Sequence, residues 1–500
     1  MANKEENEKQ TVENISSMNT ITNEDQIKSN DDILGREKPF KTIFMMSLGP
    51  FFAEIVAAAY GIIDSFWISQ ACDEDGLAAL SLCSLLDTIG RAFGMFVSSA
   101  VSSQLSKLRG RKEYDSISQV FADIFRFCFI LGIISPAILI PCTKPLMHWF
   151  SATDKIVDLA FSYIVPILSG SIITCLNLMF CGMLQSEGRS FAYCAVQIGT
   201  FILNGGVFDP LFMKAFKLGM FGAGLSTVCS EFCTMLVVAV LFFFKKFDTK
   251  ITFSNLIHKF SPETKDALSV GFTQFVSHIC FNIPSFFSRK YVSIDASKSE
   301  YSLVLTAYNV VLRTWSIPGS YCLAMSVGFL PTASYAIGAK RYKRYLKLVF
   351  WALILTFAWC AVIEVILLTL GSYIAIPFGN NTKEFRDLAE KMLRISYMFA
   401  VLMGIPEVTG GILLSTKKTV PALIVAILTQ FLPVPMFAMI LFYTDKTYDV
   451  VRLMYMYALH DVFSAVVSLL FMIPVLYQIN KLGKERKNSL VNDQPLLASQ

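Results

Sequence analysis

Carboxylates inside long apolar stretches are the residues of this chain best suited to chemistry. Asp64 lies late in the apolar stretch 43–69, and Glu54 lies ten residues earlier, roughly on the same side of a helix. An ionised Asp at the middle of a membrane costs about 2.5–3.5 kcal/mol, so such a residue persists where it is paired, hydrated or needed. We interpret Asp64 as a binding site for a proton or Na⁺ that faces the protein interior. The alternative is an interfacial residue near the outer headgroups.

A second acid, Asp209, stands where the sequence predicts a broken helix. Pro210 follows it and removes a backbone donor, and Gly205-Gly206 before it loosens the helix. A broken helix can offer both side-chain and carbonyl oxygens to Na⁺ or to a proton carrier. With Asn204 close by, the pattern predicts an ion site. A helix end at the outer face, capped by Asp209, is the alternative.

Two other acids have basic residues at helical spacing. Asp87 and Arg91 are four positions apart and share one helical face, so we interpret them as a self-neutralising pair. Asp123 and Arg126 have a similar spacing and receive the same interpretation.

Three residues are candidates for a substrate site or a secondary ion site. Glu407 follows Pro406 in a Gly-rich stretch and could contact a cation in the second half of the chain. Glu54 accompanies Asp64. His278 is first of all a hydrogen-bonded packing residue and only second a proton relay. The remaining charged residues of the apolar stretches are two lone acids and one counter-charge: Glu231, Glu364 and Arg313.

The elements that hold these residues must be membrane spans. Of the 500 residues, 54% are hydrophobic and 16% charged, whereas a soluble domain carries roughly 25% charged residues. The 12 Cys lie mostly inside apolar stretches, and the four His show no metal-ligand spacing with Cys or Asp. The composition therefore indicates a membrane protein, argues against a metal enzyme or a membrane enzyme, and gives no sign of nucleic-acid binding.

Twelve stretches are long enough to cross a bilayer, which takes about 20 apolar residues. They fall into two matching sets of six, because Gly110-Arg111-Lys112-Glu113-Tyr114 resembles the segment 338–342, 228 positions later. An even number of spans per unit gives both copies the same orientation, a parallel repeat that is typical of transporters. The predicted spans are 43–69, 77–105, 118–141, 158–184, 191–215, 221–244, 268–290, 302–332, 346–376, 392–414, 420–443 and 453–478.

The loops predict the orientation and the boundaries. Basic clusters follow the even-numbered spans, so the positive-inside rule places these loops and both termini in the cytosol. Ser261-Pro262-Glu263 predicts the start of a helix lying on the membrane surface. The predicted parts are a disordered tail 1–40, a first lobe 41–245, a linker 246–266, a second lobe 267–480 and a cytosolic tail 481–500.

These motifs resemble the multidrug and toxic compound extrusion (MATE) family over about residues 40–480. The resemblance rests on the first span ending in Asp64 and on the segments 110–114, 185–189, 204–212 and 219–227. It implies an all-α polytopic membrane protein with 12 transmembrane helices in two six-helix lobes, related by a pseudo-twofold parallel repeat in a V-shaped bundle. It also implies an ion site formed by Asp64, Asn177, Asn204, Asp209 and Thr227.

Three departures from the family pattern bear on that site. Asn204 and Asp209 are five positions apart where the family has four, so either a bulge at Gly205-Gly206 restores the geometry or Asn204 has left the site. Gly61 stands where relatives often carry Asn. The second lobe lacks the seventh-span Glu of many relatives, which favours ion coupling in the first lobe.

The resemblance implies a secondary active antiporter that exports organic cations or amphipathic drugs in exchange for H⁺ or Na⁺. We expect no cofactor beyond the coupling ion, no metal other than Na⁺ at the ion site, and a monomer in the lipid bilayer. A dileucine-like tail, Asp493-Gln494-Pro495-Leu496-Leu497, points to the plasma membrane or an endosomal or vacuolar membrane. The alternatives are a flippase for lipid-linked precursors and a non-transporting membrane receptor.

Overall fold

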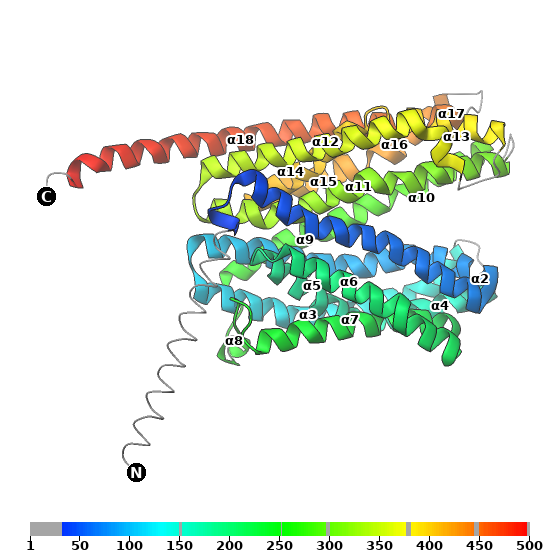
Figure 1. Ribbon diagram of the computed structural model, residues 1–500, viewed down its shortest axis with the longest axis horizontal. Helices are drawn as coiled ribbons and strands as arrows, with labels where there is room; N and C mark the ends of the chain where they lie inside the picture. Colours follow the sequence, from blue (N-terminus) through cyan, green and yellow to red (C-terminus); the bar gives the residue numbers. More distant parts are fainter. Residues whose placement is uncertain are drawn as a thin grey trace, which may run out of the picture.

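The computed structural model describes residues 33–149, 153–251, 253–296, 301–376, 382–444 and 450–497. Within these ranges the chain forms helices, turns and bends, so the predicted all-α fold is confirmed. Among the described residues, nine helices are long and apolar enough to cross a membrane, or eleven if each of two bent helix pairs is one span. Figure 1 shows the helices gathered into two lobes that lie side by side along the long axis.

The first lobe contains the first six predicted spans. Helix α2 holds the first two, Pro39–Cys72 and Asp75–Arg111, and the fourth is a pair of helices bent by 51° at Gly170. Its elements are α2 (Pro39–Arg111), α3 (Tyr114–Trp149), α4 (Asp154–Ser169), α5 (Ser171–Ser186), α6 (Ser190–Leu203), the π-helices η1 (Asn204–Phe208) and η2 (Pro210–Ala215), and α7 (Gly219–Phe243).

The second lobe follows the short helix α8 (Phe253–Ile257) of the linker. Its elements are α9 (Pro262–Asn282), α10 (Pro284–Ala296), α11 (Tyr301–Gly338), α12 (Tyr342–Ala375), α13 (Lys383–Ser396), the 3-10 helix η4 (Ala400–Leu402), α14 (Gly404–Ser415), α15 (Thr419–Ala426), the π-helix η5 (Ile427–Phe431), α16 (Pro433–Thr444), α17 (Val450–Leu453) and α18 (Tyr455–Leu497).

Two predictions about the start of the second lobe need correction. The predicted seventh span, 268–290, is not among the helices apolar enough to count as a span, and it is interrupted between α9 and α10 at Ile283. Ser261 does cap a helix, since its side chain accepts a hydrogen bond from the Glu263 N–H. That helix is α9, which enters the bundle, so it is not a helix on the membrane surface.

The repeat is visible in the backbone as well as in the motifs. Lys112 and Lys340, 228 positions apart, both end a helix with a positive φ, of 65° and 56°. Gly188 and Lys417, 229 positions apart, do the same with φ of 75° and 63°. Each lobe also has a π-helix in its fifth span, η1 in the first lobe and η5 in the second.

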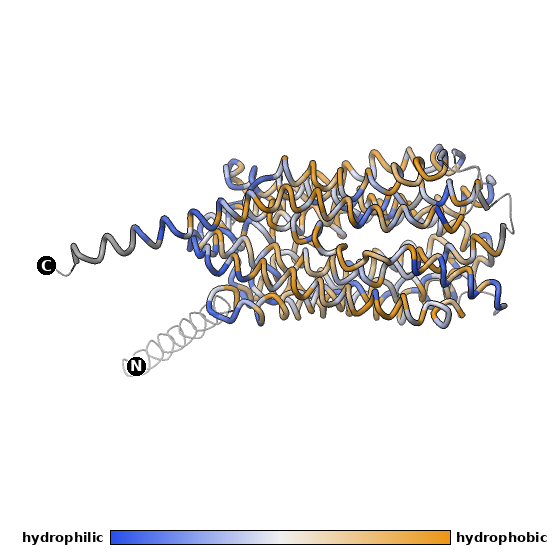
Figure 2. Tube along the Cα trace, turned by 90° about the horizontal axis from the view of Figure 1, so that it is seen from above, coloured by the Kyte–Doolittle hydropathy of each residue, from blue (hydrophilic) through white to orange (hydrophobic). Residues whose placement is uncertain are grey.

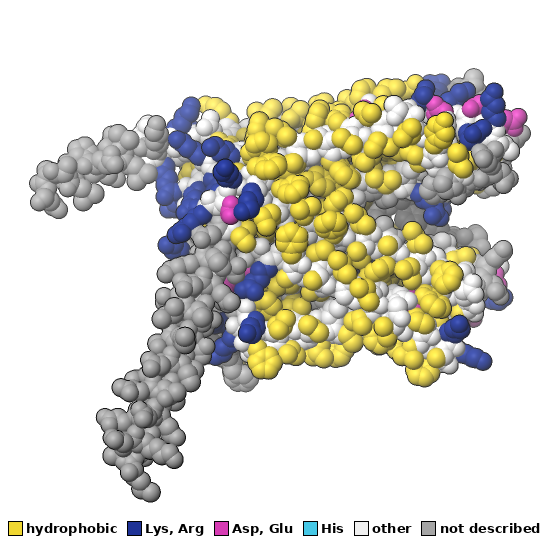
Figure 3. Space-filling view, in the orientation of Figure 1, with side chains coloured by type: hydrophobic (Ala, Val, Ile, Leu, Met, Phe, Trp, Pro, Cys, Tyr) yellow, Lys and Arg dark blue, Asp and Glu magenta, His cyan; other side chains and the backbone are white. Residues whose placement is uncertain are grey.

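Charge and hydropathy divide the surface into a band and two ends. Apolar residues cover the middle of the bundle, and hydrophilic residues gather at its ends (Figure 2). Most Lys and Arg lie at the end where α2 begins and α18 leaves the bundle (Figure 3), which we call the basic end. At the opposite end the two lobes are visibly parted in the same view.

At the basic end the lobes meet backbone to backbone along a contact that we call the seam. A Cβ atom at Gly338 would lie 2.1 Å from the carbonyl oxygen of Lys107, and one at Gly110 would lie 2.3 Å from that of Tyr335. Only glycine allows such an approach. Because Gly110 and Gly338 are equivalent positions of the repeat, the seam lies near the axis that relates the two lobes.

Candidate functional site

Asp64 is buried inside the first lobe, with 2% of its surface exposed. It lies on the first span of α2, and the hydroxyl of Tyr163 on α4 donates to its Oδ2 atom at 3.2 Å. Its Oδ1 atom is buried and has no hydrogen-bond partner in the described part of the chain. The acid therefore faces protein rather than outer solvent, and one of its oxygens remains able to bind a cation or a proton.

Asp209 lies between η1 and η2 and is completely buried. The hydroxyl of Ser226 on α7 donates to its Oδ1 atom, and Nδ2 of Asn204 donates to the same hydroxyl at 2.9 Å. Its Oδ2 atom has no partner among the residues described. Asp209 thus repeats the arrangement of Asp64, with one oxygen held and one available.

The π-helix η1 explains how Asn204 and Asp209 come together. In a π-helix the backbone bonds join residues five apart, and the N–H of Asp209 donates to the carbonyl oxygen of Asn204. Five positions therefore make about one turn, and both side chains reach the same hydroxyl of Ser226. The helix thus bulges at Gly205-Gly206, as one of the two alternatives expects, and a role of Asn204 in an ion site stays a prediction.

Neighbouring side chains close the wall around the two acids. The hydroxyls of Tyr60 and Thr227 lie 2.6 Å apart, and the indole of Trp67 donates to the carbonyl oxygen of Gly205 at 3.0 Å. The carboxyl groups of Asp64 and Asp209 lie within electrostatic range of each other. Two like charges so placed repel in a medium of low dielectric, so a bound cation would relieve both desolvation and repulsion.

Asn177 on α5 is also buried, with 3% of its surface exposed. Its Oδ1 atom has no hydrogen-bond partner within the described ranges. No hydrogen bond joins Asn177 to Asp64 or Asp209 in the described part of the chain, so Asn177 offers a third available oxygen in the lobe, and its place in the site remains a prediction.

Arg91 on α2 is a counter-charge shared by several acids of the first lobe. Asp87 and Arg91 attract each other electrostatically, although no direct ion pair joins them in the part that the structure describes. Glu231 and Glu54 also attract Arg91, and the charge of Arg91 acts on His278 of the second lobe. The cluster thus reaches from one lobe to the other.

A second polar site lies in the other lobe. Glu407 on α14 is buried and accepts a hydrogen bond from Nε2 of Gln430 on η5 at 2.8 Å, and Ser277 on α9 donates to the Oε1 atom of that glutamine at 2.8 Å. Glu407 and Gln430 border a cavity of about 410 Å³ between the lobes. Its wall also contains Phe281, Trp315, Tyr457, His460 and, from the first lobe, Ser81 and Ser84.

Sequence reasoning missed several residues of these sites. Ser226 lies in the segment 219–227, yet nothing in that segment predicts that its hydroxyl joins Asn204 to Asp209. Asp461 is 1% exposed, with its Oδ1 atom 3.0 Å from Nδ1 of His460. The sequence signal that could have identified Asp461 is its position next to His460 within an apolar stretch. The structure describes no group of three or more metal-ligating side chains among its placed residues.

Two helical lobes, buried acids in the first and a cavity between them define the class of protein: a polytopic membrane transporter of the MATE fold. The profile of the MatE family matches residues 51–211 and 295–439, more than half of the chain. The chain therefore belongs to the MATE family of transporters, and it is not an enzyme.

Comparison with known proteins gives the same family. Multidrug export protein MepA of Staphylococcus saprophyticus is 23% identical over 406 residues, which cover 79% of this chain and 86% of that protein. Multidrug export protein MepA of Staphylococcus aureus strain MSSA476 is 22% identical over 411 residues, with the same coverage.

Solved structures share the fold at low sequence identity. A MATE in complex with MaL6 superposes with a TM-score of 0.80 at 21% identity, covering 91% of this chain and 99% of that one. A transporter of the MOP superfamily from Pyrococcus furiosus, described as having a binding pocket of reverse polarity, gives 0.79 at 21% identity, covering 90% and 98%.

Proposed function

We propose that this protein is a secondary active antiporter that exports organic cations and amphipathic xenobiotics in exchange for H⁺ or Na⁺. The observation that carries the proposal is the pair of buried acids Asp64 and Asp209, each with one oxygen lacking a partner among the described residues. A buried carboxylate is costly while it is charged, and binding of a proton or Na⁺ removes that cost. The multidrug export named for the MepA relatives agrees with this assignment.

The two acids accept hydrogen bonds from different side chains, and this difference suggests how the ion would be held. Ser226 and Asn204 fix one oxygen of Asp209, while Tyr163 fixes one oxygen of Asp64. The remaining oxygens, with those of Thr227 and Asn177, would bind the ion. Ion binding would shift the conformational equilibrium by its differential affinity for the two states, and that difference couples ion to cargo.

The side chains that line the cavity between the lobes favour a cationic cargo. Glu407 supplies a carboxylate at its wall, and Trp315 and Tyr457 supply aromatic faces. Aromatic faces attract organic cations, and apolar walls suit amphipathic molecules. A lipid-pyrophosphate flippase would need several cationic side chains, whereas Arg289 is the one Arg or Lys in the described lining. His278 and Glu54 would act as secondary polar groups near the path.

The polar residues buried at the seam are evidence for a second conformation in which the basic end is open. Residues 96–109 of α2 are buried on all sides, yet they include a run of serines and Gln104. Several polar groups there, including Nε2 of Gln104 and Oγ of Ser106, have no partner in the described chain. A buried unpaired donor costs about 1–3 kcal/mol. Water would satisfy these groups if the seam opened, and the positive-inside rule places that end in the cytosol.

The test is transport in proteoliposomes that contain the full chain. We expect efflux of a fluorescent organic cation under an imposed pH or Na⁺ gradient, and the effective gradient identifies the ion. Asp64→Asn should abolish this flux at unchanged expression, whereas Asp158→Asn, a change in an exposed ion pair with Lys144, should leave it intact. Unchanged flux in Asp64→Asn would refute the ion site. Movement of lipid pyrophosphates instead of cations would favour the flippase, and no gradient-driven flux would favour a receptor.

A further inference from the structure

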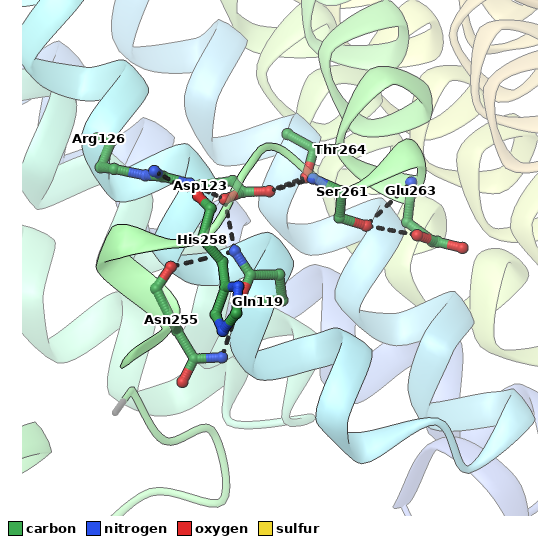
Figure 4. Close-up of polar contacts among 8 residues, drawn as sticks. All are labelled: Gln119, Asp123, Arg126, Asn255, His258, Ser261, Glu263 and Thr264. Atoms are coloured by element: carbon green, nitrogen blue, oxygen red, sulfur yellow. Dashed lines mark hydrogen bonds and ion pairs between the residues drawn. The ribbon is translucent and has the colours of Figure 1, made fainter. Parts of the chain in front are cut away.

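The linker between the lobes is held tightly on the first lobe. Asp123 of α3 is completely buried, and it accepts hydrogen bonds from the backbone N–H of Ser261 at 2.8 Å and from the hydroxyl of Thr264 at 2.7 Å. Arg126 and Gln119 donate to its other oxygen. The predicted Asp123–Arg126 ion pair is therefore present, but it is only part of a cluster that binds the start of α9 (Figure 4).

The rest of this cluster fixes the residues just before α9. Arg126 donates to the carbonyl oxygen of His258 at 2.8 Å, and its guanidinium lies 4.6 Å from the centre of the Phe260 ring. Gln119 and Asn255 exchange hydrogen bonds of 3.1 and 3.2 Å. Figure 4 shows these side chains converging from α3 on the linker. We call residues 255–264 the linker arm.

The hydroxyl of Ser261 belongs to the same arm and also contacts the carboxylate of Glu263. This hydrogen bond holds the pKa of Glu263 below its ordinary value. The first turn of α9 thus carries negative charge beside its free N–H groups, an arrangement that stabilises a helix start. The arm is a formed helix terminus rather than a loose tether.

A corresponding segment precedes the first lobe and is held by the second. Arg344 of α12 donates to the carbonyl oxygens of Leu34 at 3.1 Å and Glu37 at 2.5 Å, and to the hydroxyl of Thr42 at 3.0 Å. Arg341 donates to the carbonyl oxygen of Gly35 at 2.5 Å. We call residues 33–38 the N-terminal arm.

The N-terminal arm also fills a space at the seam. Leu34 is 1% exposed and packs in one cluster with Met46 and with Tyr335 of α11. On its other side it lies near the turn of the first lobe at Gly188, where an added Cβ would be 3.6 Å from its side chain. The arm therefore touches both lobes at the basic end.

The two arms are reciprocal. The segment that leads into the first span of each lobe is bound by the opposite lobe. The bound residues lie next to the helices or inside them, because Glu37 is two residues from the start of α2 and Thr264 lies within the first turn of α9. Separation of the lobes at the basic end would therefore pull directly on these hydrogen bonds. The bonds are charge-assisted and stand at the edge of the bundle, where water can replace them once they break.

We propose that the linker arm and the N-terminal arm are paired latches that hold the seam closed, so that opening of the basic end requires their release from Asp123 and Arg344. The inference rests on the alternating access proposed above. Its test measures conformation directly, without cargo or ion gradient, so the latches can fail while efflux persists, and efflux can fail while the latches hold.

The experiment traps the closed seam with a disulfide. The hydroxyls of Ser103 and Ser334 lie 3.0 Å apart across the seam, so Ser103→Cys/Ser334→Cys should cross-link under mild oxidation when the seam is closed. The full chain in native membranes is oxidised for timed intervals, and the linked peptide is quantified by mass spectrometry. Asp123→Asn and Arg344→Gln are compared with the exposed controls Asp115→Asn on α3 and Lys347→Gln on α12.

We expect each latch variant to lower the ratio of closed to open seam about tenfold, the scale of one lost hydrogen bond to a charged group. The lower ratio slows cross-linking and, in a Ser102→Cys background, speeds the reaction of that buried thiol with a charged maleimide about tenfold. The double variant should approach the product of both effects, because Asp123 and Arg344 lie in different lobes. Thr264→Val removes one donor and keeps the ion pair, so it should slow trapping by less even if Asp123→Asn folds poorly. Cross-linking and labelling rates that both equal those of the controls, with or without a lower melting temperature, would overturn the proposal and make the arms purely structural.

Discussion

The close approach of the two backbones at the seam predicts that a single added methyl group, in Gly338→Ala, will destabilise the closed seam. In Gly338→Ala the new Cβ would lie 2.1 Å from the oxygen, 2.9 Å from the carbonyl carbon and 3.1 Å from the Cα of Lys107. All three are backbone atoms, so no side-chain rotation can relieve the contact. To restore an ordinary contact of 3.4 Å, α2 and α11 must separate by about 1 Å at their crossing.

Separation on this scale has a predictable cost. A radial gap of about 0.5–1 Å already loses a quarter to a half of the attraction between facing atoms, and overpacking typically costs about 1–3 kcal/mol. Because the cost falls on the closed seam alone, the population with an open basic end should rise by about one to two powers of ten. Gly410→Ala is the matched control, since a Cβ there meets no atom within 4 Å.

The assay measures exposure of the seam. Ser102 is 3% exposed, so a Ser102→Cys thiol should react slowly with a charged maleimide applied to the basic end. We expect Gly338→Ala to accelerate this labelling at least tenfold and to reduce cation efflux, while Gly410→Ala changes neither. Slow labelling in Gly338→Ala, together with normal efflux, would show that the seam yields locally and that its closure does not depend on this contact.

Two further substitutions test the polar sites. Ser226→Ala leaves Asp209 and Asn204 without their shared hydroxyl, so ion-driven efflux in proteoliposomes should fall about tenfold or more; Ser230→Ala, which removes a hydroxyl bonded only to its own helix, should retain it. Glu407→Gln removes the charge at the cavity wall, so the KM for a monovalent organic cation should rise about tenfold while that for a neutral amphipath stays constant; equal KM values would place cation recognition elsewhere.

Much of the fold could be predicted from hydropathy and repeats, because long apolar stretches have few structural solutions in a membrane. The start of the second lobe was the exception. α9 carries Gln274 and Ser277 on faces that meet other helices, and Gly271 packs against the backbone of Phe96. A span buried between two lobes needs less apolar surface than one that faces lipid, so its composition falls below the level expected of a span.

The candidate site could be predicted only in part. The burial of Asp64 and Asp209 follows from charge placed in apolar stretches. The π-helix at Gly205-Gly206 corresponds to a bulge that is one of two alternatives the sequence leaves open. Partners distant in sequence could not be inferred. Asp123 shows the limit best: its local partner Arg126 follows from spacing, whereas Ser261 and Thr264 lie 138 and 141 positions away, and only the folded chain brings them together.

One helix belongs to both the ion site and the seam. The part of the first span far from the basic end carries Asp64 inside the first lobe. The part of this span nearer the basic end packs against the second lobe. There, Ile43 joins the core of the second lobe, and the ring of Phe51 lies 5.2 Å from the ring of Tyr321. Pro50 lies inside the helix in this same part, and it has no N–H to donate to a backbone hydrogen bond. A change of charge at Asp64 therefore acts on a helix already divided between the lobes, and we expect it to reach the seam through α2.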